Sequence, residues 1–361
     1  MRYFLRLSTL FLVLFFLLSA CTSEQTRKYQ VTPNSYGKVD NIMVVADDYT
    51  WTTAIGDTFR NFFEAYYPVT PQPESIYDVQ HKKPKAFKEA KILRTHRAII
   101  ILGVLDDEED YASALVRKSL GAQNIERARN DKSYRIAIHK NRWATGQIVV
   151  YWFAPTRSEL LATVARDHKK VMQVFNKADT EKFIEQIYIP GQNLEASKLI
   201  ESSLDISIKI PRAFQLAHND STAVWLRKET DKISSNIFIY SLPLSDSTLP
   251  SPEHHKRIRN QLTKNYFSTH IEGSYMQIDD RVLPIYYQSM TFDKKETLQA
   301  RGLWGMVNDF MGGSFLSYMI VDKERQRVIF LDGFIHAPGQ KKRPELRKLD
   351  MVFSTFNIDQ L

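Results

Sequence analysis

Two groups of acidic residues follow expected strands, at positions where their carboxylates could together bind a cation. A pair of acidic residues follows each of two apolar runs, Ile42–Ala46 and Ala98–Leu102. Short unbroken apolar runs are typical of strands covered on both faces, and neighbouring parallel strands end at one edge of a sheet. Carboxylates that converge there repel one another, and a hard divalent cation relieves the repulsion through oxygen ligands. One hypothesis is therefore a metal-assisted hydrolase, and its metal ligands are Asp47, Asp48, Asp106 and Asp107.

The same acids also precede two expected helices, Trp51–Tyr67 and Tyr111–Asn130. Acidic side chains at a helix start accept hydrogen bonds from the first amide groups and complement the helix dipole. No D-x-D-x-D-G spacing of a calcium loop accompanies them. Helix capping is therefore the preferred interpretation, and a metal site is the alternative.

Arg301–Ser314 (RGLWGMVNDFMGGS) combines glycines with aromatic residues. Glycines let a backbone approach a ligand closely, and aromatic rings offer a stacking wall. The structural interpretation, a Gly-Gly turn with the rings in the core, is preferred. The segment is still the best candidate for a binding surface, or for an apolar cleft that takes a small ligand. Its candidate binding residues are Trp304, Asn308, Asp309, Phe310, Gly312 and Gly313, and Met311 joins them in the cleft hypothesis.

Cys21 is the only cysteine in the 361 residues, and it ends a segment with the features of a secretory signal. Arg2 and Arg6 precede the apolar run Leu10–Leu18, and Leu18-Ser19-Ala20-Cys21 closes it. The pattern resembles the lipobox of bacterial lipoproteins, in which the thiol is acylated and the chain is cut before it. We therefore expect a signal peptide at 1–20 and a lipidated tether at 21–35. Diacylglycerol and palmitate-type chains on Cys21 would hold the protein in a lipid bilayer.

The tether and the charge indicate the compartment and the partners. The lipobox resemblance implies the cell envelope, and the absence of an acidic run in Thr22–Ser35 after the cysteine favours an outer membrane, facing the periplasm. The formal net charge of +8 is spread along the chain and does not indicate nucleic acid. We expect an envelope protein or a glycan as a further partner, and no cofactor.

Two smaller features have two interpretations each. The basic stretch Lys341-Lys342-Arg343 with Arg347 and Lys348 either contacts anionic lipid headgroups or, as preferred, is a solvated loop. The pair His254-His255 lies near a helix start, and we expect both rings to be solvated rather than to bind a ligand.

The order of elements predicts two domains. Residues 36–190 alternate buried strands with helices, which predicts an α/β sandwich with a parallel strand pair. Residues 191–361 predict an antiparallel sheet with helices on one face. Its strands are expected at Asp205–Pro211, Ala223–Arg227, Asn236–Tyr240, Arg281–Met290, Ser314–Val321 and Arg327–Phe334.

The second domain resembles the PsbP/Mog1/LpqN-type sandwich. The resemblance rests on a strand that ends in Ile210-Pro211, the hairpin through Ala223–Tyr240, and a late helix that ends in Ser354-Thr355-Phe356. It extends to the fold alone. Members of that fold bind partners or small ligands and are mostly not enzymes.

The chain after the tether also resembles a family of uncharacterised Bacteroidetes-type lipoproteins, a domain of unknown function. The resemblance rests on Ile42–Asp48 with Trp51, on Thr95–Ile101, and above all on Arg301–Trp304 with Asn308–Gly313. It implies an envelope lipoprotein and nothing about catalysis.

No familiar catalytic motif occurs in the sequence. G-x-S-x-G, H-E-x-x-H, the P-loop and G-x-G-x-x-G are all missing, and the nine histidines have no zinc-ligand spacing. The leading hypothesis is therefore a non-catalytic binding or accessory protein of the envelope. Enzymatic activity stays open, because the acid pairs of glycosidases meet in space rather than in sequence.

Overall fold

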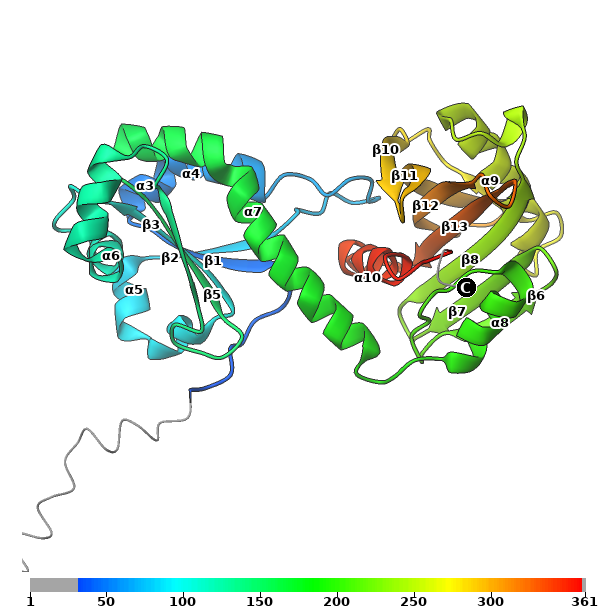
Figure 1. Ribbon diagram of the computed structural model, residues 1–361, viewed down its shortest axis with the longest axis horizontal. Coiled ribbons are helices and arrows are strands. Elements are labelled where there is room, and N and C mark those ends of the chain that lie inside the picture. Colours follow the sequence, from blue (N-terminus) through cyan, green and yellow to red (C-terminus); the bar gives the residue numbers. More distant parts are fainter. Residues whose placement is uncertain (1–31, 359–361) are drawn as a thin grey trace, which may run out of the picture. The chain divides into compact units, whose positions relative to one another are not determined.

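A computed structural model of the chain describes residues 32–358 (Figure 1). The predicted signal peptide and Cys21 lie outside these residues. The described chain forms two compact units, each built from separate stretches. The first takes in Ile42–Ile55 and Gln80–Thr163. The second takes in Val39–Asn41, Gly56–Val79 and the chain from Val164 onward.

The first sheet is mixed and mostly parallel, with the strand order β2-β1-β3-β5-β4. Strand β3 pairs in parallel with β1 and with β5, while β4 runs antiparallel to β5 at the edge. The elements up to residue 188 are β1 (Asn41–Val45), α3 (Asp48–Thr52), α4 (Ala54–Phe63), β2 (Asp78–Lys82), α5 (Pro84–Glu89), the 3-10 turn η1 (Lys91–Thr95), β3 (Ala98–Val104), α6 (Tyr111–Asn130), β4 (Ile136–Lys140), β5 (Ile148–Ala154) and α7 (Arg157–Tyr188).

The apolar runs of the sequence become the central strands of this sheet. Every residue of β3 is buried, because both faces of the strand are covered. Phe87 of α5 and Val116 of α6 pack on one face, against side chains such as Ile99 and Val149. Helix α6 is interrupted at Gly121, where φ is +73°. The predicted α/β architecture with a parallel strand pair is therefore confirmed.

The second sheet has eight strands, seven of them in the order β10-β11-β12-β13-β8-β7-β6, with β9 on the side of β11. All of its recorded strand pairs are antiparallel. The elements of this part are α8 (Leu194–Leu204), β6 (Gln215–Asn219), β7 (Ala223–Glu229), β8 (Ser234–Pro243), the 3-10 turn η2 (Asp246–Thr248), α9 (Pro252–Tyr266), β9 (Tyr275–Ile278), β10 (Tyr286–Phe292), β11 (Lys295–Val307), β12 (Gly312–Asp322), β13 (Arg327–His336) and α10 (Arg343–Phe353).

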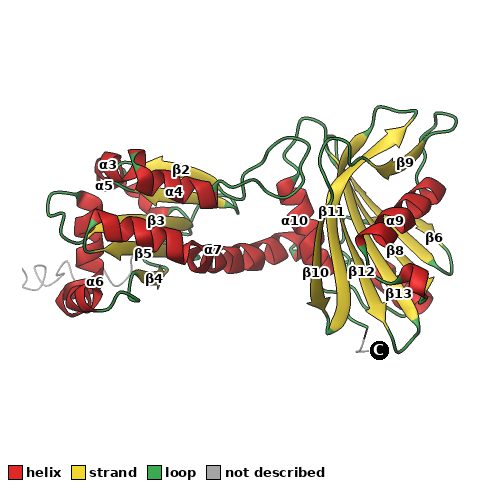
Figure 2. Ribbon diagram, turned by 90° about the horizontal axis from the view of Figure 1, so that it is seen from above, coloured by secondary structure: helices red, strands yellow, loops and turns green. Residues whose placement is uncertain are grey.

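Helices cover both faces of this curled sheet, whereas we expected them on one (Figure 2). Alternate residues of β12 point to opposite faces. Leu316 and Ile320 join a core with α8 and α10, while Phe315 and Met319 join a core with α9. The apolar face of α9 is short, because basic and polar residues fill most of the helix. Ser251 caps the helix, and Pro252 is its first residue.

One predicted strand does not form, and one long observed strand was not predicted. Asp205–Pro211 buries Ile206, Ile208 and Ile210 alternately but forms only isolated bridges, because no neighbouring strand pairs with it over several residues. Strand β11 was not expected, because glycines and charged residues interrupt its apolar residues. Its last seven residues belong to the glycine-rich candidate segment.

A polar cluster lies inside the core on the α9 face. The side chain of Arg259 donates two hydrogen bonds of 3.0 Å to the Asp332 carboxylate, and both side chains are buried. His255 is also buried, and its Nε2 lies 2.6 Å from Oγ of Ser317. The expectation that His255 is solvated is therefore wrong. The residue lies on the face of α9 that meets the sheet, where Nε2 has Ser317 as its partner and Nδ1 lies 3.3 Å from the hydroxyl of Tyr287.

We expect His255 to make the stability depend on pH. Burial, with a further contribution from Arg259, lowers the pKa of His255 from 6.5 to about 3. The unfolded chain takes up a proton below about pH 6.5 and the folded chain does not. The stabilisation by neutral His255 is therefore complete above that pH and is lost as the pH falls toward 3.

Between pH 7 and pH 5 this loss should be about 2 kcal/mol in the free energy of unfolding. Urea unfolding at both pH values measures it, with His255→Gln as the comparison, because glutamine hydrogen bonds but does not titrate in this range. The variant should lose about 2 kcal/mol less than the wild type. An equal loss in both proteins would show that His255 is not the group responsible.

Candidate functional site

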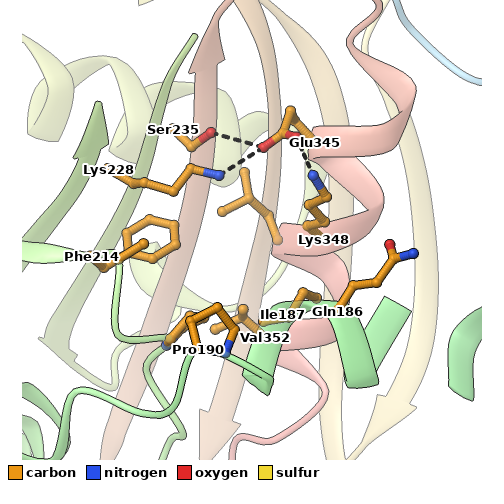
Figure 3. A pocket seen from close by; sticks show the side chains of 12 residues that line it. Gln186, Ile187, Pro190, Phe214, Lys228, Ser235, Glu345, Lys348 and Val352 are labelled. Carbon is orange, nitrogen blue, oxygen red and sulfur yellow. Dashed lines mark hydrogen bonds and ion pairs between the residues drawn. The ribbon is translucent and has the colours of Figure 1, made fainter. Parts of the chain in front are cut away.

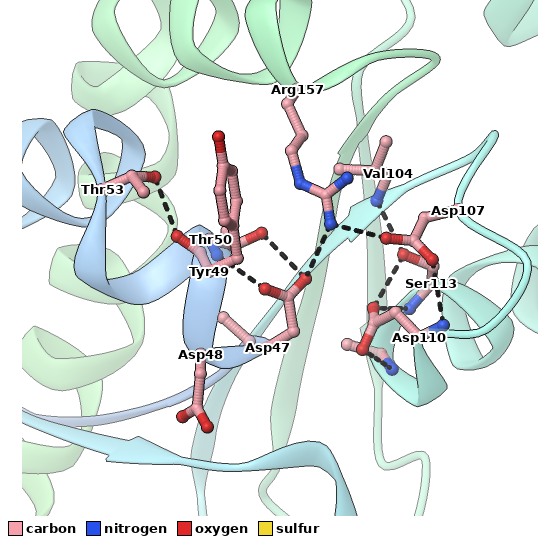
Figure 4. A network of polar contacts seen from close by, with 12 residues as sticks. Asp47, Asp48, Tyr49, Thr50, Thr53, Val104, Asp107, Asp110, Ser113 and Arg157 are labelled. Carbon is pink, nitrogen blue, oxygen red and sulfur yellow. Dashed lines mark hydrogen bonds and ion pairs between the residues drawn. The ribbon is translucent and has the colours of Figure 1, made fainter.

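The strand-end acids lie at one edge of the first sheet, as the parallel pairing predicts (Figure 4). Asp47 caps α3 and accepts a hydrogen bond of 2.6 Å from the backbone amide of Thr50. Asp107 accepts one of 3.1 Å from the backbone amide of Asp110. The guanidinium of Arg157, the first residue of α7, lies between them, 2.6 Å from Asp107 and 3.8 Å from Asp47.

The four acids do not converge on a common point. Asp48 pairs with Lys83 at 2.7 Å, and Asp106 pairs with Arg129 at 2.7 Å. Within residues 32–358 no group of three or more His, Cys, Asp or Glu side chains is placed to hold a metal ion. Only Asp47 and Asp107 of the four meet, and the positive charge of Arg157 lies between them. The geometry thus supports capping and ion pairing of these acids rather than a shared metal ion.

The pKa of Asp107 agrees with this structural role. Burial alone would raise that pKa, but the backbone amide of Asp110 and the Arg157 guanidinium outweigh it, so the pKa lies below its usual value. A carboxyl group held in the charged form suits an ion pair and does not suit a general acid near neutral pH.

The candidate segment Arg301–Ser314 forms the β11–β12 hairpin. Trp304 is buried in β11, and Asn308 is in the turn with a φ of +58°. Asp309 accepts a hydrogen bond of 2.7 Å from the amide of Phe310, whose side chain is fully exposed. The segment therefore provides one buried ring and one exposed ring on the same hairpin.

Gly313 explains why the glycine and the tryptophan occur together. Gly313 pairs with Trp304 across the hairpin, and the indole Nε1 of Trp304 donates a 3.2 Å hydrogen bond to the carbonyl oxygen of Ile335 on β13. A Cβ added at Gly313 would overlap that oxygen and lie 3.0 Å from the indole nitrogen. At Gly312 a Cβ would lie 2.9 Å from the carbonyl oxygen of Trp304. Close packing between the strands and against the indole thus accounts for glycine at both positions.

A cavity of about 280 Å³ lies beside Trp304, and we call it the aromatic cleft. Four aromatic rings and three methionines line it. The rings of Trp225 and Phe334 each meet Phe267 edge to face, with centroids 4.8 Å apart. The apolar lining residues are Trp225, Phe267, Met276, Trp304, Met306, Met311 and Phe334. Of the predicted binding residues, Trp304 and Asp309 line the cleft, and Phe310 is on the turn next to it.

Polar groups also line the aromatic cleft. The indole of Trp225 donates a 3.0 Å hydrogen bond to Oδ1 of Asn236, and Nδ1 of His336 lies 2.9 Å from the carbonyl oxygen of Gly312. Because a carbonyl oxygen only accepts, His336 must donate through Nδ1. Apolar walls with a few placed polar groups are typical of ligand sites.

The sequence did not indicate a second cavity, of about 190 Å³, which we call the lysine pocket (Figure 3). Glu345 lies at one end, 3.0 Å from Nζ of Lys228 and 2.5 Å from Nζ of Lys348. Oγ of Ser235 donates a longer bond of 3.3 Å to the same carboxylate. Apolar side chains form the other walls, and they include Ile187, Pro190, Phe214, Leu349 and Val352.

The basic stretch of α10 is not the solvated loop that was preferred, because several of its side chains are buried. The backbone amides of Lys342 and Arg343 donate to the Glu74 carboxylate at 2.6 and 3.0 Å. Arg347 pairs with Asp40. Acidic residues distant in the sequence neutralise these side chains, which is why the local pattern alone predicted a solvated stretch.

Family comparisons divide the chain in two. Residues 35–188 match the family described as Domain of unknown function (DUF8532), and residues 193–355 match the one described as Domain of unknown function (DUF4837). The predicted resemblance to a single family is thus supported at a coarser level, as two domains of unknown function. No curated protein matches the chain.

Solved structures of Mog1 are similar to part of the chain. One is a mutant of the protein Mog1, with 13% identity, and another is the Saccharomyces cerevisiae Ran-binding protein Mog1p, with 12% identity. Each match covers 43% of this chain and 90% of the other, with a TM-score of 0.29. A likeness at this level carries no argument about function.

The predicted anchor at Cys21 lies outside the described residues. Within the part of the chain that the structure describes, no helix has the length and apolar character to cross a bilayer.

Proposed function

We propose that this chain is an envelope lipoprotein that acts by binding, and that the aromatic cleft of its second unit is the binding site. The lipobox-like segment that ends at Cys21 supports the anchor. The proposed location is the outer membrane, on its periplasmic side. The binding role rests on the cleft, and the partner is a protein or another envelope component with an exposed apolar group.

The observation that carries the binding role is the combination of seven apolar side chains around one cavity with an exposed phenylalanine beside it. Phe310 is fully exposed beside this cavity, so a partner that occupies the cleft can also cover the ring and gain free energy from its burial. The cleft volume of about 280 Å³ is just below the range for drug-sized ligands, which begins at about 300 Å³. Such a cleft takes one large apolar side chain or a group of similar size.

Photo-crosslinking in intact cells tests this proposal. A photo-reactive phenylalanine analogue replaces Phe310 in one strain and Leu249 in another, because Leu249 is also exposed but does not line the cleft. We expect a discrete adduct from position 310 and none from position 249. The adduct should weaken severalfold when Trp225→Ala removes a wall of the cleft.

The anchor is tested in the same cells by Cys21→Ala. We expect the adduct to disappear with this variant, and mass spectrometry of the wild type to show an acylated Cys21 at the new N-terminus. An unmodified thiol would refute the anchor. Equal adducts from positions 310 and 249 would refute the cleft as the binding site.

A further inference from the structure

We infer that the lysine pocket is a separate binding site for a small apolar carboxylate, a molecule with one negative charge and a short hydrocarbon body. The pocket is formed by α10, by the strands β7 and β8, and by the segments around Ile187 and Phe214. None of its lining residues lines the aromatic cleft, so the inference does not depend on the function proposed for that cleft.

The charges in the pocket favour an anion. Burial would raise the pKa of Glu345, but Lys228 and Lys348 outweigh it and hold this pKa below its usual value. Glu345 is therefore ionised, and the three side chains together carry one net positive charge. An ammonium group has three N–H donors, so a lysine that is already bonded to Glu345 can also bond a ligand oxygen. A ligand with a single negative charge neutralises the group.

The remaining walls favour an apolar body. Ile187, Leu349 and Val352 are hydrocarbon, and Phe214 adds an aromatic face whose centroid lies 5.9 Å from Nζ of Lys228 (Figure 3). The volume of about 190 Å³ is below the range of drug-sized sites. The ligand is therefore small, either a short free acid or the C-terminal residue of a peptide with an apolar side chain.

Calorimetric titration of the full chain with hexanoate tests the inference. We expect saturable binding of hexanoate, with hexanol and acetate at least tenfold weaker, because each lacks one of the two required features. A short peptide that ends in leucine tests whether the ligand is the C-terminal residue of a peptide. The peptide with a free C-terminal carboxylate should bind, and the same peptide with a C-terminal amide should not. Equal affinity for hexanol and hexanoate, or no saturable binding of any probe, would overturn the inference.

Variants locate the binding within the pocket. Lys348→Ala should weaken hexanoate binding about tenfold, and Lys348→Arg should retain it, while Lys198→Ala on the exposed side of α8 serves as the matched control. Glu345→Gln should tighten binding, because the competing carboxylate is removed. Ala213→Phe obstructs the pocket from an exposed position and should abolish binding without a change in the core. Binding that survives Ala213→Phe would refute the assignment.

Discussion

Gly313→Ala is expected to lower the free energy of unfolding by about 3 kcal/mol or more. The added Cβ overlaps the carbonyl oxygen of Ile335, so β12 or β13 must move. The indole of Trp304 then loses its hydrogen bond to that oxygen and is left buried without it. Overpacking costs about 1–3 kcal/mol, and a buried unsatisfied donor costs about 1–3 kcal/mol more.

Gly305→Ala is the matched control for this prediction. Gly305 is in β11 of the same hairpin, but a Cβ there would lie 3.8 Å or more from its nearest neighbours. We expect its free energy of unfolding to change by less than about 1 kcal/mol. Urea unfolding monitored by tryptophan fluorescence measures both variants. Equal effects at the two glycines would show that close strand packing is not the reason for Gly313.

Asp332→Ala is expected to destabilise the protein by about 3–5 kcal/mol. The substitution leaves the guanidinium of Arg259 buried without its two hydrogen bonds to a carboxylate. Arg259 also lies over the ring of Phe315, 3.8 Å from its centroid, so it cannot easily move into water. An uncompensated buried charge is among the most costly consequences of a single substitution.

The double variant Arg259→Met/Asp332→Leu tests whether the unpaired charge of Arg259 causes the destabilisation. Because two apolar side chains replace both charges, we expect it to recover most of the stability that Asp332→Ala loses. Asp280→Ala is the control. Asp280 forms a partly exposed ion pair with Lys256, which is in α9 like Arg259. Its loss should lower the free energy of unfolding by less than about 1 kcal/mol. A double variant no more stable than Asp332→Ala would contradict this explanation.

The strands that could be read from the sequence are those whose burial follows a local pattern. Ile42–Ala46 and Ala98–Leu102 are unbroken apolar runs, and both became central strands of the first sheet. In contrast, Lys295–Val307 was missed, because Gly302 and Gly305 interrupt its apolar residues. A Cβ at Gly302 would overlap the ring of Phe315 on β12. Packing between two strands therefore requires this glycine, and the local sequence pattern does not show that requirement.

Alternating apolar and polar residues in the sequence predict which side chains are buried, but not whether the backbone pairs with another strand. Ile206, Ile208 and Ile210 alternate as a strand would, and all three are buried. The backbone between them forms only isolated bridges, at Ser207 to Asn357 and at Pro211 to Gln192. Whether a partner strand is present depends on the rest of the fold.

The candidate sites show the same limit. The sequence correctly indicated that the acids after β1 and β3 share a sheet edge, but not that Arg157 lies between two of them. It pointed to Trp304 and the turn beside it, but not to Trp225 and Phe267, which complete the aromatic cleft from other strands and loops. In the lysine pocket the sequence pointed to Lys348 within a basic stretch, but not to Lys228, which meets the same Glu345 from 117 positions away.

The sequence by itself determined the fold class of each half of the chain, the order of most helices and strands, and the central strands of the first sheet. These features follow from the spacing of apolar residues within a single helix or strand. Only the tertiary structure decided which charges neutralise one another, which glycines permit close packing, and where cavities remain. Those properties depend on distances between residues far apart in the chain, and no local pattern records such distances.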